Sequence, residues 1–191
     1  MEYIPAKTIL SKCKSSEWFG TDYNMNIYRG CCHGCVYCDS RSDCYHISDF
    51  DMVKAKKDAL IILRNELKRK VRSGVIGTGA MSDPYNPFEK ELMLTRHSLE
   101  LIDAFNFGVS VITKSSLITR DIDILKSIAE HSPVICKLTV TTADDILCKK
   151  LEPNVSPSSE RFETISQLNE NGIFSVSYTH LRAHETCADL V

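Results

Sequence analysis

Three cysteines stand within eight residues of the chain, at Cys31, Cys35 and Cys38, with the spacing Cys-x3-Cys-x2-Cys. Thiolates are the ligands that soft metal centres prefer, and three of them on one loop can surround a single centre. A four-iron cluster has four metal corners, so three thiolates leave one iron free to bind a small molecule. The spacing therefore predicts a metal centre that takes part in chemistry rather than one that only supports the fold.

Two other uses of the cysteines stay open. Cys31, Cys35, Cys38 and Cys44 can bind zinc in a non-enzymatic module that recognises a partner or nucleic acid, although only one Cys-x2-Cys knuckle is present. Disulfides are less favoured, because the cysteine count is odd, at nine, and five of the nine fall between residues 31 and 44. The opening residues lack a signal-peptide layout, which favours an intracellular metal site. Cys32 is expected to point away from that site.

The residues around the cysteines narrow the interpretation. The pattern Tyr-Arg-Gly-Cys-x-His-Gly-Cys-x-Tyr-Cys-Asp-Ser-Arg-Ser, at residues 28–42, resembles the radical S-adenosylmethionine superfamily, in its branch related to spore photoproduct lyase and other DNA-repair lyases. The likeness extends from about Tyr23 to about Ile173. It implies a [4Fe–4S] cluster whose open iron binds S-adenosylmethionine and cleaves it to a 5′-deoxyadenosyl radical. It also implies an electron donor such as flavodoxin or ferredoxin.

Length and composition fit one globular domain. The chain has 191 residues, of which 43% are hydrophobic and 25% charged. A formal net charge of −2 provides no general attraction for nucleic acid, so a nucleic-acid substrate stays a hypothesis. No apolar run reaches the roughly 18 residues that a membrane helix needs. We expect a cytoplasmic protein without membrane contact.

Short apolar strands alternate with helical patterns along the chain, which predicts an α/β fold with parallel strands and right-handed crossovers. Strands are expected at 24–28, 74–79, 109–113, 134–140 and from 173, and helices at 48–71, 94–107, 120–129, 144–151 and 159–171. Ser48 and Asp51 are spaced like a capping box for the first helix. In the last helix, Phe162, Ile165 and Leu168 are expected to face inward. With the resemblance, this order implies a partial (β/α)6 barrel, truncated after the fifth strand.

Ligands in such folds bind at the C-terminal ends of the strands. The resemblance implies that S-adenosylmethionine is held there by Tyr37, Gly79, Ser82, Asp83, Lys114, Thr139 and Thr141. Ordinary alternatives exist, because Asp83 can form a turn before Pro84 and Lys114 can be an exposed loop residue. The two threonines fit a strand through β-propensity alone.

Two further positions bear on the chemistry. His33, between two of the cysteines, either tunes the metal centre through a hydrogen bond or faces solvent. Ala80 departs from the resembling branch, because spore photoproduct lyase has a cysteine at this place that returns a hydrogen to the substrate radical. The spore-photoproduct reaction is therefore not expected to proceed efficiently, and the substrate is left open.

The chain divides into a lead-in segment at residues 1–22, a radical S-adenosylmethionine core at 23–176 and a tail at 177–191. The tail does not continue the alternating pattern and resembles translated sequencing-adapter sequence, with a genuine C-terminal helix as the alternative. We therefore expect an incomplete core that cleaves S-adenosylmethionine poorly or not at all.

Overall fold

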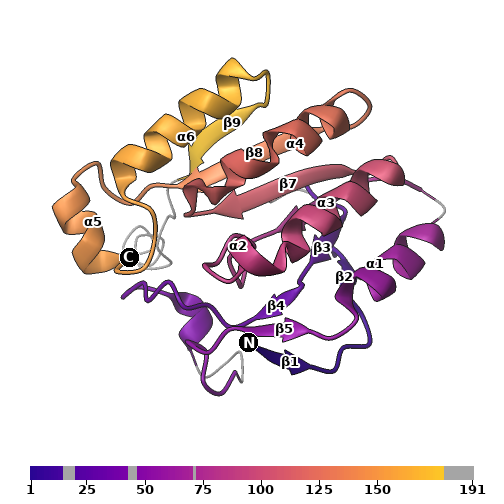
Figure 1. The fold of residues 1–191 in the computed structure, drawn as a ribbon, viewed down its shortest axis with the longest axis horizontal. Helices are drawn as coiled ribbons and strands as arrows, with labels where there is room; N and C mark the ends of the chain where they lie inside the picture. The colour runs from indigo at the N-terminus through magenta and orange to yellow at the C-terminus, as the bar shows by residue number, and fades with distance from the viewer. Residues whose placement is uncertain (15–19, 43–46, 71, 179–191) are drawn as a thin grey trace, which may run out of the picture.

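The computed structural model describes residues 1–14, 20–42, 47–70 and 72–178. Its centre is a six-stranded sheet in the order β2-β3-β6-β7-β8-β9 (Figure 1). The strands are β2 (Leu10–Lys12), β3 (Tyr23–Met25), β6 (Val75–Thr78), β7 (Gly108–Thr113), β8 (Val134–Thr139) and β9 (Ser175–Tyr178). β2 is antiparallel to β3, and the other five strands are parallel. The predicted α/β class with five parallel strands is confirmed.

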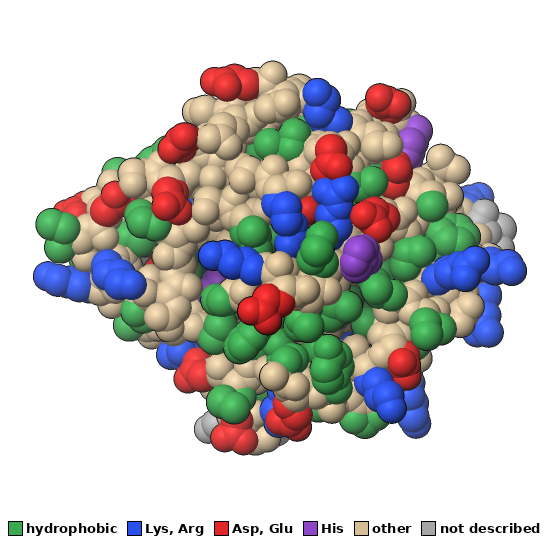
Figure 2. Space-filling model, viewed as in Figure 1, with side chains coloured by type: hydrophobic (Ala, Val, Ile, Leu, Met, Phe, Trp, Pro, Cys, Tyr) green, Lys and Arg blue, Asp and Glu red, His purple; other side chains and the backbone are tan. Residues whose placement is uncertain are grey.

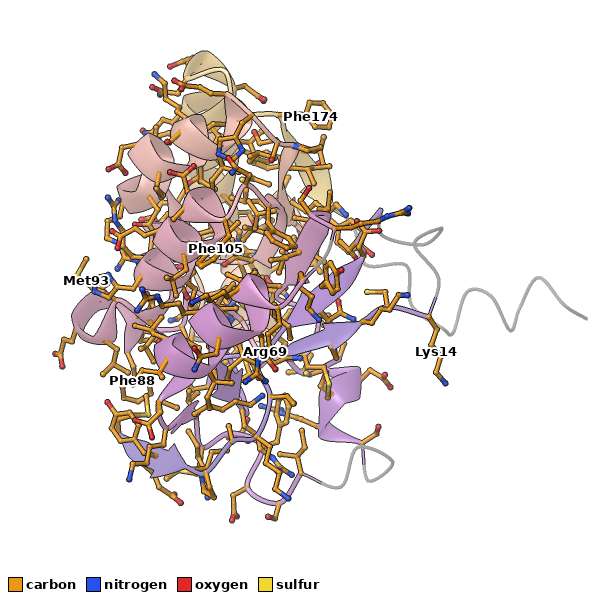
Figure 3. The ribbon with its side chains drawn as sticks, turned by 90° about the vertical axis from the view of Figure 1, so that its right-hand side faces the viewer. Lys14, Arg69, Phe88, Met93, Phe105 and Phe174 are labelled. Atoms are coloured by element: carbon orange, nitrogen blue, oxygen red, sulfur yellow. The ribbon has the colours of Figure 1, made fainter. Side chains whose placement is uncertain are left out.

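Helices cover one face of this sheet (Figure 3). α3 (Leu94–Ala104), α4 (Ile122–Ala129) and α6 (Ser158–Glu170) contact the strands directly, and α1 (Ala59–Lys68) packs against α3. The described residues also form α2 (Glu89–Leu92), α5 (Asp145–Leu151) and the 3-10 turns η1 (Asp39–Arg41) and η3 (Ser116–Asp121). The longer helices bury leucine and isoleucine side chains at helical spacing, such as Leu99 and Ile102 of α3, both 0% exposed. No helix among the described residues is long and apolar enough to cross a membrane.

A second, three-stranded sheet has the order β1-β5-β4, formed by β1 (Glu2–Ile4), β5 (Lys54–Lys56) and β4 (Tyr28–Arg29). β1 is parallel to β5 and β4 is antiparallel to it. The predicted strand at 24–28 is therefore two strands in different sheets, because Tyr23 pairs with Ile76 whereas Tyr28 pairs with Ala55. The small sheet fixes the residue from which the cysteine-bearing loop begins.

The predicted helix at 48–71 is wrong in its first half. β5 occupies residues 54–56, and the helix begins only at Ala59. Asp49 and Asp58 have φ angles of 54° and 56°, which an α-helix does not accommodate. Phe50 instead accepts a hydrogen bond from the amide of Cys31 at 2.8 Å. The segment before α1 therefore supports the cysteine loop.

The ends of the chain add detail to the expected segments. The lead-in at 1–22 contains β1 and β2, whose three residues each are too short to show a period in the sequence. β9 includes Ser177 and Tyr178, the first two residues of the expected tail. The rest of that tail, like Cys44, lies outside the described residues.

Figure 2 shows acidic and basic side chains interspersed over one face, in keeping with the small net charge.

Candidate cluster and cofactor site

A cavity of about 230 Å³ lies at the C-terminal ends of β6, β7, β8 and β9. The loop of residues 30–38, called the cysteine loop below, forms one of its walls. All three predicted cluster cysteines line this cavity, and so do five of the seven predicted cofactor residues: Cys31, Cys35, Cys38, Tyr37, Gly79, Asp83, Lys114 and Thr139. The structure therefore brings together residues that are more than 100 positions apart in the sequence.

The cysteine loop is shaped by two glycines. Gly30 and Gly34 have φ angles of 80° and 72°, a region that side chains disfavour. A Cβ on Gly30 would lie 2.6 Å from the carbonyl oxygen of Phe50, so only glycine lets these backbones approach. Cys35 is buried, whereas Cys31 and Cys38 are half-buried. The loop thus places all three cysteines at one cavity.

His33 is buried and contacts Cys31, so it does not face solvent. Its Nδ1 lies 3.5 Å from Oδ2 of Asp83. Burial raises the pKa of the Cys31 thiol, but the hydrogen bond with His33 and the charge of His33 together outweigh it, and the pKa lies below its ordinary value. At Cys35, burial dominates and raises the pKa to about 11. Cys31 is therefore the thiol of this pair that its surroundings favour as a thiolate, the form that binds metal.

Asp83 ties the loop after β6 to the end of β7. Its Oδ1 accepts hydrogen bonds from the amide of Tyr85 at 2.8 Å and the hydroxyl of Thr113 at 2.7 Å. Its Oδ2 accepts one from the amide of Lys114 at 2.8 Å. The carboxylate is only 8% exposed. Asp83 therefore lines the cavity while its oxygens already hold protein groups in place.

Gly79 and Lys114 line the cavity from the ends of β6 and β7. Gly79 has a φ of 98°, and a Cβ there would lie 1.9 Å from the carbonyl oxygen of Ile112. Only glycine fits at this point, where the β6 loop approaches the end of β7. The Nζ of Lys114 lies 5.7 Å from the ring centroid of Tyr37. An ammonium group and an aromatic ring thus share one side of the cavity.

Two predicted residues do not line the cavity. Ser82 is half-buried beside it, and Thr141 is exposed beyond the end of β8, although its hydroxyl bonds Tyr37. Residues that the sequence did not single out as ligands also line it, among them Met81, Thr113 and Tyr178. The position of Tyr178 at a strand end could have indicated this role, but the sequence pattern assigned Tyr178 to the tail.

The donor set fits a cluster. Among the described residues, which omit Cys44, no three Cys, His, Asp or Glu side chains are placed to hold one metal ion. A cubane cluster differs from a single ion, because it takes each cysteine at a separate corner. Three cysteines around one cavity supply that donor set and leave the fourth corner for another ligand.

The model of the radical SAM superfamily matches residues 25–186, and the chain belongs to that superfamily. An uncharacterized protein of Methanocaldococcus jannaschii is 35% identical over 162 residues, which cover 83% of this chain and 60% of the relative. An uncharacterized protein of Mycobacterium tuberculosis is 27% identical over 177 residues, covering 89% and 52%. The chain thus spans about half to three-fifths of the length of these relatives.

Solved structures of spore photoproduct lyase share the fold. The complex with dinucleoside spore photoproduct has a TM-score of 0.65 at 13% identity and covers 96% of this chain and 52% of that chain. A double variant with bound AdoMet (S-adenosylmethionine) and dinucleoside spore photoproduct has a TM-score of 0.61 at 13% identity, covering 93% and 50%. The predicted partial radical S-adenosylmethionine fold, in its spore photoproduct lyase-like form, is confirmed. The roles of the individual site residues stay predictions.

Proposed function

We propose that this chain forms the cluster- and cofactor-binding part of a radical S-adenosylmethionine enzyme. One observation carries the proposal: Cys31, Cys35 and Cys38 line a single cavity at the strand ends, together with Lys114. When bound, a [4Fe–4S] cluster would supply the electron that cleaves S-adenosylmethionine to a 5′-deoxyadenosyl radical. An external electron donor such as flavodoxin or ferredoxin belongs to the same proposal.

The chain's own residues would bind and orient the cofactor. The ammonium of Lys114 can pair with the carboxylate of the methionine part. The backbone at Gly79 lets carbonyl oxygens approach the amino group closely. Thr139 offers a hydroxyl from the end of β8, and the ring of Tyr37 forms an apolar wall. His33 supports the sulfur of Cys31 through a hydrogen bond.

The substrate belongs to the proposal only in outline. Ala80 lines the cavity, where the resembling lyase has a hydrogen-donating cysteine. An alanine methyl cannot replace an S–H bond as a hydrogen donor, so we propose a reaction other than efficient spore-photoproduct repair. Clean, multiple-turnover recovery of thymine from a spore-photoproduct dinucleotide would overturn this part.

Anaerobic reconstitution tests the metal centre. Wild-type protein should be brown and retain iron and sulfide, and Cys31→Ala, Cys35→Ala and Cys38→Ala should each lose them. Cys32→Ala is the matched control and should retain them. Full iron content in the Cys35 variant would contradict the ligand set, and a colourless protein with one zinc would favour the zinc module instead.

The enzymatic part is tested by product analysis. The reconstituted chain, and in parallel the Methanocaldococcus jannaschii relative, are reduced with dithionite in the presence of S-adenosylmethionine. Formation of 5′-deoxyadenosine that depends on the three cysteines is expected at least with the relative. Its absence from both cluster-loaded proteins would contradict the proposed activity.

A further inference from the structure

Tyr37 is held from a distant part of the chain. Its hydroxyl donates a hydrogen bond to Glu152, which lies 115 residues further on, directly after α5. An oxygen of Glu152 in turn accepts a hydrogen bond from Arg161 of α6 at 2.6 Å. The side chains of Glu152 and Arg161 are both 0% exposed. These three residues are called the Tyr37 triad below.

Arg161 joins three elements behind the cavity. Its NH1 donates to the carbonyl oxygen of Thr139 at 2.5 Å, at the end of β8. Its Nε donates to the carbonyl oxygen of Ser156 at 2.7 Å, and its NH2 lies 2.8 Å from the sulfur of Cys148 in α5. Each of the three guanidinium nitrogens therefore has a partner, and the position of the guanidinium fixes that of the Glu152 carboxylate.

Stability alone does not account for such a pair. Taking two charges out of water costs several kcal/mol each, on the order of what their attraction returns, and apolar replacements are often no less stable. Burial raises the pKa of Glu152, but the hydrogen bond from Tyr37 and the charge of Arg161 outweigh it, and the pKa is lowered. Glu152 therefore stays a carboxylate, which is a strong and fixed acceptor for the Tyr37 hydroxyl.

The same segment also holds the backbone of the cysteine loop. The amide of Val36 donates to the carbonyl oxygen of Leu151 at 2.9 Å. Asn154 donates through its amide to the carbonyl oxygen of His33 at 3.2 Å and through its side chain to that of Cys32 at 2.9 Å. Residues 151–154 thus form a support on which the cysteine loop lies.

We infer that Glu152 and Arg161 are positioning residues for S-adenosylmethionine, because they fix Tyr37 as a wall of the cavity that they do not themselves line. The inference rests on the proposed function and adds two residues to it. A ring without its acceptor can rotate away from Lys114 and from the space between the cysteine loop and β8. Loss of this hydrogen bond should therefore lower the affinity for S-adenosylmethionine and make the cysteine loop less ordered.

Two double variants separate the hydrogen bond from the ion pair. Glu152→Leu with Arg161→Met removes both charges and the acceptor, whereas Glu152→Gln with Arg161→Met removes both charges and retains an amide oxygen for Tyr37. Tyr37→Phe removes the tyrosine hydroxyl, with its hydrogen bonds to Glu152 and Thr141, and keeps the experiment interpretable if a double variant fails to fold. Tyr28→Phe, which removes a buried tyrosine hydroxyl just before the loop, is the matched control.

Two readouts are used. Calorimetry on the cluster-loaded protein gives the dissociation constant for S-adenosylmethionine, and hydrogen exchange on the cluster-free protein gives the protection of the Val36 amide. Losing one hydrogen bond should raise the dissociation constant about fivefold and lower the protection of the Val36 amide by a similar factor. Tyr37→Phe and the leucine double variant should show this loss. The glutamine double variant and Tyr28→Phe should remain within about twofold of wild type.

The outcomes distinguish the inference from the proposed function. Equal affinities for the leucine and glutamine double variants, or an unchanged affinity for Tyr37→Phe, would overturn the positioning role while the wild type still binds the cofactor. Faster exchange with unchanged affinity would also overturn it, because the triad would then support only the loop. A cluster-loaded wild type that binds no S-adenosylmethionine would contradict the proposed function itself.

Discussion

A second triad of the same residue types stands at the other end of the cysteine loop. The hydroxyl of Tyr28, in β4, donates to Glu89 of α2, and the same carboxylate accepts a hydrogen bond from Arg120 at 3.2 Å. This Tyr28 triad and the Tyr37 triad thus anchor the residues that precede and end the loop. In each, a tyrosine hydroxyl meets a fully buried glutamate that is paired with an arginine.

The two triads differ in their surroundings. Tyr28 is 3% exposed and belongs to the hydrophobic core, whereas Tyr37 lines the cavity. Arg120 is 22% exposed and also pairs with Asp121 at 2.8 Å, whereas Arg161 is fully buried. The same three groups therefore meet in the hydrophobic core at one place and beside the cavity at the other. The two triads are distinguished by what the tyrosine ring faces, which is the core for Tyr28 and the cavity for Tyr37.

The glutamates also differ in protonation. At Glu89, burial dominates over the hydrogen bonds from Tyr28 and Arg120, and the pKa is raised. At Glu152, the partners outweigh burial, and the pKa is lowered. The two arginines differ in the same sense, because Arg161 is fully buried, whereas Arg120 is partly exposed and also pairs with Asp121. A buried charge is screened less than an exposed one.

Removing the arginines should give the largest contrast. Arg161→Ala should lower the free energy of unfolding by about 3–5 kcal/mol, since it leaves a buried carboxylate without its cation. Arg120→Ala should cost less, about 1–3 kcal/mol, because Arg120 is partly exposed and Glu89 keeps hydrogen bonds from Tyr28 and the amide of Thr95. Urea denaturation measures both losses. A larger loss for Arg120→Ala would reverse the comparison.

Sequence patterns predicted the general frame around these triads. The five parallel strands follow apolar runs bounded by glycine and proline, and the cysteines and strand-end residues converge because parallel strands end at one edge. In α6, Phe162 was expected to face inward, but it is 43% exposed and its neighbour Arg161 is buried. Periodicity assigns apolar residues to the core. It does not reveal a buried charge whose partner, Glu152, comes from the loop after α5.

The strand and helix before the site show a second limit. Residues 24–28 alternate as one strand should, yet they contribute to two sheets. The pairing partners that decide this, Ile76 for Tyr23 and Ala55 for Tyr28, are distant in the sequence, and a local pattern contains no information about them. The contact between Tyr37 and Glu152 is of the same kind, because it joins residues 115 positions apart.

The pH dependence of stability should have opposite signs at the two glutamates. The carboxylate of Glu152 has a lowered pKa, so its stabilisation is present above the ordinary value of 4.5 and is lost as the pH falls through the folded pKa. Glu89 has a raised pKa, so its contribution is present below 4.5 and is lost as the pH rises through the folded pKa. The effect should be smaller than that of either arginine deletion.

Glutamine variants isolate the two contributions. The difference in unfolding free energy between wild type and Glu152→Gln should shrink as the pH is lowered from about 6 toward about 3, the range over which carboxylates titrate. The difference between wild type and Glu89→Gln should change in the opposite direction. Parallel curves for the two variants would show that the triads do not differ electrostatically.

The smallest effect is expected for Asp145→Ala. This variant tests whether the triad variants act by breaking the contact with Tyr37 or by loosening the packing of α5 and α6. Its carboxylate accepts hydrogen bonds from the amide of Ser159 at 2.9 Å and from the Ser159 hydroxyl at 2.6 Å, so it joins the starts of the two helices. Asp145 is exposed and contacts none of the three triad residues through these bonds. Asp145→Ala should therefore lower stability slightly and leave both the affinity for S-adenosylmethionine and the protection of the Val36 amide unchanged.

If this variant instead reproduces the losses of the Glu152→Leu, Arg161→Met protein, looser helix packing suffices to explain them, and the distinction between the two triads disappears. If the losses appear only in the variants that break the hydrogen bond between Tyr37 and residue 152, those variants act through the Tyr37 hydroxyl, because Asp145→Ala and the glutamine double variant both retain that hydrogen bond.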